Sequence, residues 1–273
     1  MTVSARPTIA PKAAPRPRFR RTPNALVIGL ISLVCFFALW QLSGLWIAPV
    51  YFSTPLAIIG AAGTLIANGQ LVTAVADTVI TVVIALGLGA IVGISTGILM
   101  GRVRPARRVI APMVSFANAA PTIALLPLME IWFGIDLTAR IAFAFLLCVF
   151  TILLNTLAGV ESLGEERLEL AHSLGLGRWL SIRRIVLPGA SPHILAGLRV
   201  ASAQALVGAV LAGQEVGQAG LGGLAAIFGT YFQTPQLLVS VITSTIIGSL
   251  LFLGLRIFQN TRLPWIRELG QGR

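Results

Sequence analysis

The sequence predicts an all-α membrane protein with about six membrane-spanning helices. Hydrophobic residues make up 56% of its 273 residues and charged residues 11%, and the mean hydropathy is +0.90. These values are far from those of ordinary globular proteins. No charged residue occurs between Arg21 and Asp77, and long uncharged runs recur further along the chain. Because a bilayer core requires about 20 apolar residues per helix, the runs indicate repeated membrane crossings.

Six spans account for the uncharged runs with the fewest assumptions. The predicted spans are Ala25–Ile47, Val75–Met100, Val109–Met129, Ala139–Val160, His193–Gly213 and Leu237–Ile257. The second is long enough to begin outside the hydrocarbon or to tilt. The fifth contains Arg199, which we expect near the cytoplasmic end or facing protein rather than lipid. Cys35 and Cys148 both lie inside apolar runs, where we expect them to act as small packing residues.

The basic residues predict that both termini are cytoplasmic. Nearly all of the 20 basic residues fall in the N-terminal tail, the turn after the second span, the loop after the fourth span and the C-terminal region. These segments lie on one side of the membrane, and the positive-inside rule makes that side cytoplasmic. The protein is therefore expected to be a multi-pass protein of the plasma (inner) membrane.

The chain divides into four predicted segments. A basic, proline-rich tail (1–24) precedes the first span and an outer interfacial helix (25–72), followed by a core (73–260) and a C-terminal tail (261–273). We expect the first tail to be disordered, to fix the topology and to contact anionic lipid head groups. A nucleic-acid-binding arm is the alternative, but the positive-inside loops already explain the net charge of +11, so no nucleic acid is expected. A cleaved signal peptide is disfavoured because the apolar run is long and no small-residue cleavage site follows it.

Local signals on the outer side predict a short helix and an irregular loop. Ser53-Thr54-Pro55 has the hydroxyl cap and early proline of a helix start, and Asn68-Gly69 is typical of a helix end. We therefore expect a helix over Pro55–Ala67 at the outer interface. The last outer loop, 213–236, is dense in glycine, which indicates irregular or re-entrant backbone.

A glycine repeat marks one face of the second span. Gly89, Gly93, Gly97 and Gly101 recur every four residues and form a smooth ridge along the helix. Such ridges allow two membrane helices to approach closely. Packing within the chain is the favoured interpretation, and a dimer seam or a sliding face near a pathway is the alternative.

The polar segment 161–192 predicts two helices held outside the bilayer. An amphipathic helix over Glu161–Leu174 would end at Gly175, because glycine enters the left-handed conformation at low cost. A second short helix, about Trp179–Val186, would lead to Leu187-Pro188, and Ser191-Pro192 would cap the fifth span. The apolar face of the first helix can fill a groove on a partner protein. An amphipathic surface helix without a partner is the alternative.

The spacing of this segment is specific. Glu169-Leu170-Ala171-His172-Ser173-Leu174-Gly175, followed by Ile185-Val186-Leu187-Pro188, fits the pattern E-A-A-x3-G-x9-I-x-L-P except at Leu170. It resembles the EAA loop of ABC importer permeases, the cytoplasmic element through which an ATPase moves the membrane helices. Ser53–Pro55, Ala120–Leu128 and Ala212–Glu215 are similar to the subfamily that imports sulfonates, taurine, nitrate and related small organic anions. Other members import vitamin precursors, and the arginine that relatives often carry near Thr81 is absent here.

The resemblance implies a homodimeric channel with ABC ATPase subunits below it and a solute-binding protein above it. The ATPase-coupling residues would be Glu169, Leu170, Ala171, His172, Leu174, Gly175, Ile185, Leu187 and Pro188. ATP binding would draw the paired loops together and rock the helices towards an outward-facing state. The chain has no G-x4-G-K-[ST] motif, and its single lysine is Lys12, so the nucleotide site is expected on another subunit. No catalytic residue, metal site or cofactor is expected here.

Candidate residues for the translocation path are Asn118, Pro121, Gln204 and Glu215. The three polar side chains lie in or beside predicted spans, where polar groups are often functional, although hydrogen bonding between helices is the alternative. Pro121 would either break the third span and expose backbone groups, as in transporters with discontinuous helices, or produce a simple kink. An ion-coupled secondary transporter is the alternative function, but no internal repeat or buried coupling charge supports it. A membrane-embedded enzyme would need a catalytic constellation that we do not find.

Overall fold

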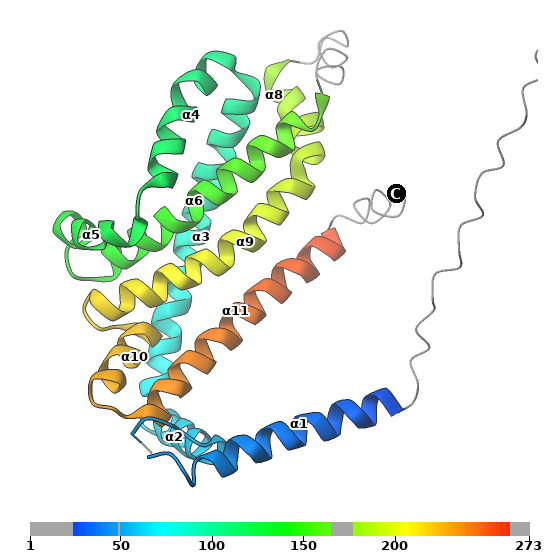
Figure 1. Cartoon of the computed structure of the whole chain (residues 1–273). Coiled ribbons are helices and arrows are strands. Elements are labelled where there is room, and N and C mark those ends of the chain that lie inside the picture. Colours follow the sequence, from blue (N-terminus) through cyan, green and yellow to red (C-terminus); the bar gives the residue numbers. More distant parts are fainter. Residues whose placement is uncertain (1–23, 49, 165–176, 263–273) are drawn as a thin grey trace, which may run out of the picture.

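The computed structural model describes residues 24–48, 50–164 and 177–262, and all regular structure in these ranges is helical (Figure 1). In chain order the helices are α1 (Asn24–Ser43), α2 (Pro55–Ala67), α3 (Gln70–Arg102), α4 (Arg104–Ala119), the 3-10 helix η1 (Thr122–Leu125), α5 (Leu126–Phe133), α6 (Leu137–Glu161), α8 (Arg178–Ser181), the π-helical turn η2 (Ile182–Val186), α9 (Leu187–Glu215), α10 (Gly220–Thr230) and α11 (Thr234–Arg262). The predicted all-α membrane fold is confirmed.

Four helices in the described ranges are long and apolar enough to cross a membrane. They are Gln70–Arg102, Leu137–Glu161, Trp179–Glu215 and Thr234–Gln259. Helix α4 and the η1–α5 segment are bent by 92° relative to each other, and together they have the composition of a fifth, broken span or of a re-entrant loop. The apolar stretch of α1 is shorter than these spans, and α1 ends at Ser43 rather than at the predicted Ile47.

The core of the bundle is made by α3, α6 and α9. Helix α6 packs against both α3 and α9 along its length, and α10 and α11 pack against α9 (Figure 1). Fully buried side chains at this centre include Val82, Ala85, Ala144, Ile152 and Ala205. Most are small, which lets the helix backbones approach one another closely where lipid provides no hydrophobic drive.

The glycine ridge of α3 lies against α6. A Cβ atom on Gly89 would lie 2.8 Å from Cys148 Sγ, and one on Gly93 would lie 3.0 Å from the backbone oxygen of Val149. A Cβ on Gly97 would lie 2.7 Å from Thr156 Cβ. A Cβ on Gly101 would lie 2.6 Å from Val160 Cγ1. All four contacts are within one chain, which favours the intrachain interpretation over a dimer seam.

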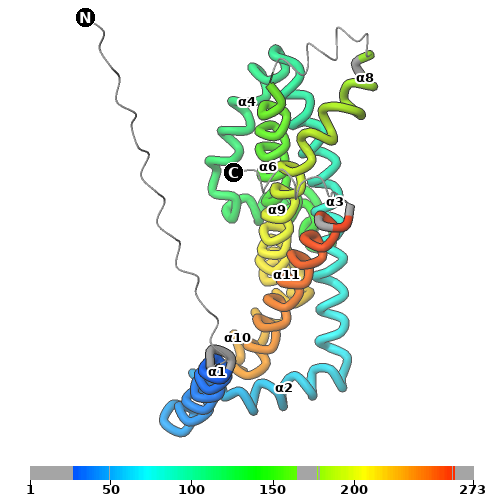
Figure 2. The backbone as a smooth tube through the Cα atoms, turned by 90° about the vertical axis from the view of Figure 1, so that its right-hand side faces the viewer, coloured from blue at the N-terminus to red at the C-terminus, as the bar shows by residue number. Residues whose placement is uncertain are grey.

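Helix α1 extends away from the bundle, and α2 connects α1 to the start of α3 (Figure 2). The predicted bounds of α2, Pro55–Ala67, are confirmed, with the Thr54 hydroxyl accepting a hydrogen bond from the Ala57 backbone N–H at 3.4 Å. The Trp40 indole N–H donates to the Ser53 carbonyl at 3.0 Å, which fixes the end of α1 beside the start of α2.

One end of the bundle is rich in arginine. We call it the basic end; it comprises the end of α3, the start of α4, the end of α6, and α8. From Trp179 to Glu215, α8, η2 and α9 form one continuous helix. The prediction that Ser191-Pro192 caps a new helix is therefore wrong, since Pro192 lies inside α9.

A π-helical turn explains how the helix continues through Leu187-Pro188. The Leu187 N–H donates to the carbonyl of Ile182, five residues back. The next residue, Pro188, has no N–H and would clash with a regular preceding turn. A wider turn relieves that clash without ending the helix. A proline that would usually mark a helix boundary is thereby accommodated.

At the opposite end of the bundle, the predicted irregular loop 213–236 is mostly helical. Helix α10 occupies Gly220–Thr230, and irregular backbone remains in the turn 231–233, where Phe232 has φ 55°, and in the few residues between α9 and α10. There Gly217, Gln218 and Gly220 adopt φ of 67°, 45° and 66°. Glycine takes this left-handed conformation without steric cost. A Cβ on Gly220 would also lie 2.7 Å from the Thr78 hydroxyl oxygen, so glycine is needed there for close approach as well.

Candidate functional site

The described part of the predicted coupling loop is mounted rigidly on the basic end. Val160 and Leu163 from the end of α6 form a buried cluster with Val186, Ala190 and Ile194. Helices α6 and α9 meet closely here, because a Cβ on Gly159 would lie 2.8 Å from His193 Cβ. Any displacement of this part of the loop must therefore be shared with both helices.

Polar contacts tie the same segment to the turn between α3 and α4. The Arg102 guanidinium donates to the hydroxyl of Ser181, a residue only 3% exposed, at 3.5 Å. Arg107 forms an ion pair with Glu161 at the end of α6. Both side chains of this pair are about half exposed, and exposed pairs contribute little to stability, about 0–1 kcal/mol. Apolar packing against α6 and α9 therefore holds this segment in place more than the ion pair does.

The structure places three of the predicted coupling residues. Ile185 is half-buried in η2, whereas Leu187 and Pro188 are exposed at the start of α9. Trp179 of α8 is 74% exposed. The other predicted coupling residues, Glu169, Leu170, Ala171, His172, Leu174 and Gly175, lie outside the described residues.

The third predicted span is not continuous. Ala120 is extended (φ −67°, ψ 141°), as expected for a residue before proline, and Pro121 cannot donate a helical hydrogen bond. The chain then restarts in η1 and α5 at the 92° bend. The predicted span over Val109–Met129 is therefore interrupted. Of the two alternatives that the sequence left open at Pro121, the structure shows the break rather than the simple kink.

A cavity of about 320 Å³ lies beside this break. Its apolar lining comes from Ile123, Leu126, Pro127 and Leu211, and its polar lining from Glu130, Gln214 and Glu215. The walls belong to η1, α5 and the last turns of α9, so the cavity forms where the broken span meets the end of α9. Within the described part of the chain, neither carboxylate has an ion-pair partner and no basic side chain lines the cavity.

The four predicted path residues are only partly brought together. Glu215 lines the cavity, and Pro121 directly precedes η1, which forms one wall. Asn118 is exposed near the end of α4 and does not line the cavity. Gln204 lies further along α9, where its side-chain oxygen is buried without a hydrogen-bond partner. Glu130 was not predicted; its position at the edge of an uncharged run was the signal available in the sequence.

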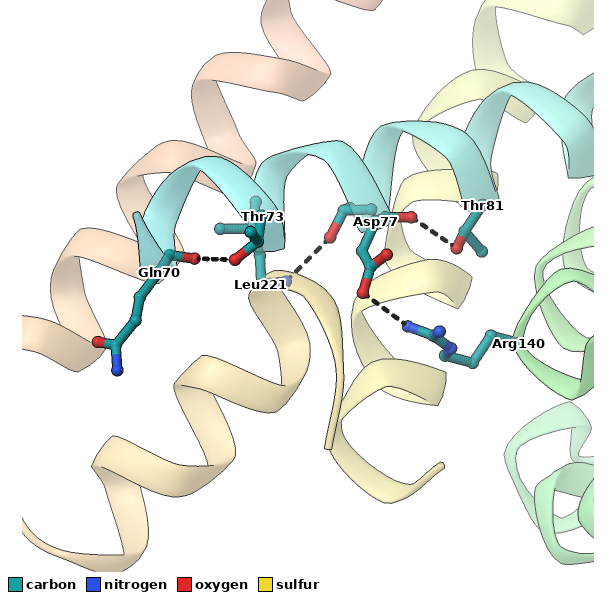
Figure 3. Close-up of polar contacts among 7 residues, drawn as sticks. Gln70, Thr73, Asp77, Thr81, Arg140 and Leu221 are labelled. Carbon is teal, nitrogen blue, oxygen red and sulfur yellow. Dashed lines mark hydrogen bonds and ion pairs between the residues drawn. The ribbon is translucent and has the colours of Figure 1, made fainter. Parts of the chain in front are cut away.

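An ion pair that the sequence analysis missed joins the first turns of α6 to α3 (Figure 3). Arg140 of α6 is 9% exposed at its side chain and faces Asp77 of α3, with 3.7 Å between Nη1 and Oδ2. At the next residue of α3, the Thr78 hydroxyl accepts the backbone N–H of Leu221 at 2.9 Å, which holds the start of α10 against α3. Asp77 and Arg140 each precede an uncharged run, but only the parallel packing of α3 and α6 shows that they pair.

Arg199 faces protein rather than lipid. Its guanidinium donates to the side-chain oxygen of Gln259 on α11 and lies 5.3 Å from the centroid of the Phe252 ring. A cation over an aromatic face is attracted by the ring's electrons. This contact joins α9 to α11. In the described ranges, no three His, Cys, Asp or Glu side chains are grouped as metal ligands would be.

Comparison with known proteins identifies relatives across most of the chain. The family described as "Binding-protein-dependent transport system inner membrane component" matches residues 85–268. The taurine transport system permease protein of Escherichia coli is 35% identical over 188 residues, which are 69% of this chain and 68% of the relative. The formylaminopyrimidine transport permease protein of Halalkalibacterium halodurans is 27% identical over 91% of this chain and 99% of its own length.

A solved structure shares the fold. A chain of the inward-facing MetNI methionine ABC transporter superimposes with a TM-score of 0.63, at 18% sequence identity, over 69% of this chain and 94% of its own length. At this identity the likeness extends to the arrangement of helices alone.

Proposed function

The chain belongs to the family of binding-protein-dependent transport system inner membrane components, the permeases of ABC importers, and on that premise we propose how it takes part in transport. As a permease, this subunit forms the membrane path and is not itself catalytic. We propose that ATP is hydrolysed by separate ATPase subunits, that a solute-binding protein delivers the solute, and that two copies of the chain form the channel.

The observation that carries the coupling proposal is the exposed apolar surface at the basic end. Trp179 and Leu187 are 74% and 41% exposed next to a segment held firmly on α6 and α9. An apolar surface flanked by arginines is suited to a groove on a soluble partner. The coupling residues predicted at 169–175 directly precede this surface in the sequence, so we assign the ATPase contact to this end.

This assignment also orients the chain. The ATPase works on cytoplasmic ATP, so the basic end faces the cytoplasm, in agreement with the positive-inside rule. The cavity between η1, α5 and α9 then lies towards the outer side, where a solute-binding protein would release its solute. Charged side chains at membrane depth face protein or water rather than lipid. Glu130 and Glu215 therefore favour this face as part of the path.

The relatives guide the choice of solute class. Their names specify taurine, aliphatic sulfonates, riboflavin and formylaminopyrimidine as transported compounds. We propose that this chain likewise transports a small organic solute of the sulfonate, taurine or vitamin-precursor type. Nitrate is included as a candidate solute only because the sequence resembles the subfamily that also imports it.

Purification in mild detergent from the native membrane, followed by mass spectrometry, tests the assembly. We expect an ATPase and a permease in equal amounts, with a solute-binding protein bound under nucleotide-trapping conditions. A permease that purifies without any ATPase, and whose vesicles take up solute without ATP, would contradict the proposal.

A loop variant tests the coupling surface. Gly175→Trp should abolish ATPase binding while the chain still inserts in the membrane, because a bulky residue prevents the predicted helix end. Gly177→Ala is the matched control, since a Cβ there meets nothing within 4 Å. Normal ATPase binding and uptake by Gly175→Trp would refute this role.

A further inference from the structure

We infer that the cavity beside the broken span binds the positively charged group of a small solute, an ammonium or a similar organic cation. The inference rests on the proposed function and narrows its solute class. Two carboxylates from different helices, Glu130 of α5 and Glu215 of α9, line the same cavity together with the Gln214 amide. The solute expected from this lining carries a cationic group and is not a simple anion.

The electrostatics of the cavity are negative from three sources. The first two are the Glu130 and Glu215 carboxylates, which both line the cavity. The last turn of α9 adds a partial negative charge, about half an elementary charge, because the helix ends at Glu215. Among the described residues, Arg140 is the basic residue at this end of the bundle, and it is already paired with Asp77 (Figure 3). A bare anion entering the cavity would therefore meet repulsion without a compensating cation.

The cavity also has the size and lining of a small-molecule site. Its volume of about 320 Å³ falls within the range of small-molecule sites, about 300–1,000 Å³. The apolar side chains of the lining can cover the carbon skeleton of a small solute, while the Gln214 amide can donate to an oxygen or accept from an ammonium. An amine-bearing solute with a short apolar chain fits all three kinds of lining.

The test measures the charge preference of the cavity without knowledge of the solute. In a Cys35→Ser, Cys148→Ala background, Ile123→Cys places a single thiol in the cavity wall. The purified permease in nanodiscs is treated with two methanethiosulfonates, one carrying a trimethylammonium group and one a sulfonate. A carboxylate within several ångströms should favour the cationic reagent by on the order of tenfold in rate, after correction for intrinsic reactivity.

Matched variants assign the preference to the two carboxylates. Adding Glu130→Gln and Glu215→Gln to the reporter should bring the rate ratio close to one. Tyr231→Cys, exposed in the turn before α11, is the control thiol and should show no such preference. A ratio near one with both glutamates present, a ratio unaffected by their removal, or a thiol that neither reagent reaches would each overturn the inference.

An uptake assay in the assembled importer gives a second reading. Radiolabelled taurine, which carries an ammonium group, is compared with isethionate, which carries a hydroxyl in its place. We expect taurine uptake to exceed isethionate uptake and to fall at least tenfold in Glu130→Gln, Glu215→Gln. Equal uptake of the two sulfonates would count against the inference. The thiol assay needs no ATPase, so a failure of the importer proposal would leave its result readable.

Discussion

Replacement of Gly97 by valine should loosen the contact between α3 and α6. A Cβ at this position would lie 2.7 Å from Thr156 Cβ and 2.8 Å from the backbone oxygen of Leu153. Carbon atoms pack at about 3.5–4.0 Å, so the helices would have to separate locally by roughly 1 Å. The backbone oxygen cannot rotate away as a side chain can. Overpacking of this kind typically costs about 1–3 kcal/mol, and we expect the upper part of that range.

The matched control is Gly87→Val on the same helix. A Cβ on Gly87 meets nothing within 4 Å, so this variant has the same change in helix propensity without the clash. Both purified variants are unfolded by sodium dodecyl sulfate in mixed micelles and followed by tryptophan fluorescence. Gly97→Val should unfold at a clearly lower detergent fraction than Gly87→Val. The measurement is made on the monomer, so that subunit contacts do not contribute.

Equal unfolding free energies for the two variants would refute the packing argument. A loss of stability confined to the dimer, with an unaffected monomer, would instead assign the glycine ridge to a seam between copies. That outcome would contradict the intrachain contacts described for α3 and α6.

Two further predictions concern the polar contacts at the opposite end of the bundle. Asp77→Asn leaves the buried Arg140 guanidinium without its counter-charge and should destabilise the fold by about 1–3 kcal/mol. This is below the full cost of breaking a buried pair, because the Asp77 side chain is 47% exposed. Asp136→Asn, at an exposed residue, should show no change in the same unfolding assay, and equal effects of the two variants would contradict the pairing. Thr78→Val removes the acceptor of the Leu221 N–H and should speed hydrogen exchange at that amide by on the order of tenfold or more, the equivalent of a lost buried hydrogen bond; unchanged protection would show that the bond does not hold α10.

Features encoded by neighbouring residues could be predicted from the sequence. The bounds of α2 follow from Thr54-Pro55 and Asn68-Gly69, which are cap signals that act within one turn. The uncharged runs likewise identified four of the six predicted spans, those in α3, α6, α9 and α11, since the bilayer imposes length and composition directly. The continuity of α9 was missed because Pro188 is read locally as a boundary, whereas a π-helical turn five residues long absorbs it.

Features that depend on which helices are neighbours could not be predicted. The Asp77–Arg140 pair joins α3 to α6, and nothing in either local sequence specifies the partner. The cavity combines Glu130 and Glu215, of which the sequence singled out only the second, because their proximity requires the 92° bend of the broken span. The break itself was open between a kink and a full interruption, since proline permits both.

The unbroken helix from Trp179 to Glu215 has a mechanical consequence. Its 37 residues, at about 1.5 Å each, make a rod roughly 55 Å long. A tilt of about 5° about its midpoint would move each end by roughly 2.4 Å in opposite directions. Trp179 stands at the proposed ATPase contact and Glu215 in the wall of the cavity. A small displacement imposed at one membrane face would therefore reposition a carboxylate at the other without any change of secondary structure. In this way ATP binding and the affinity of the cavity for a cationic solute would be coupled through a single rigid helix.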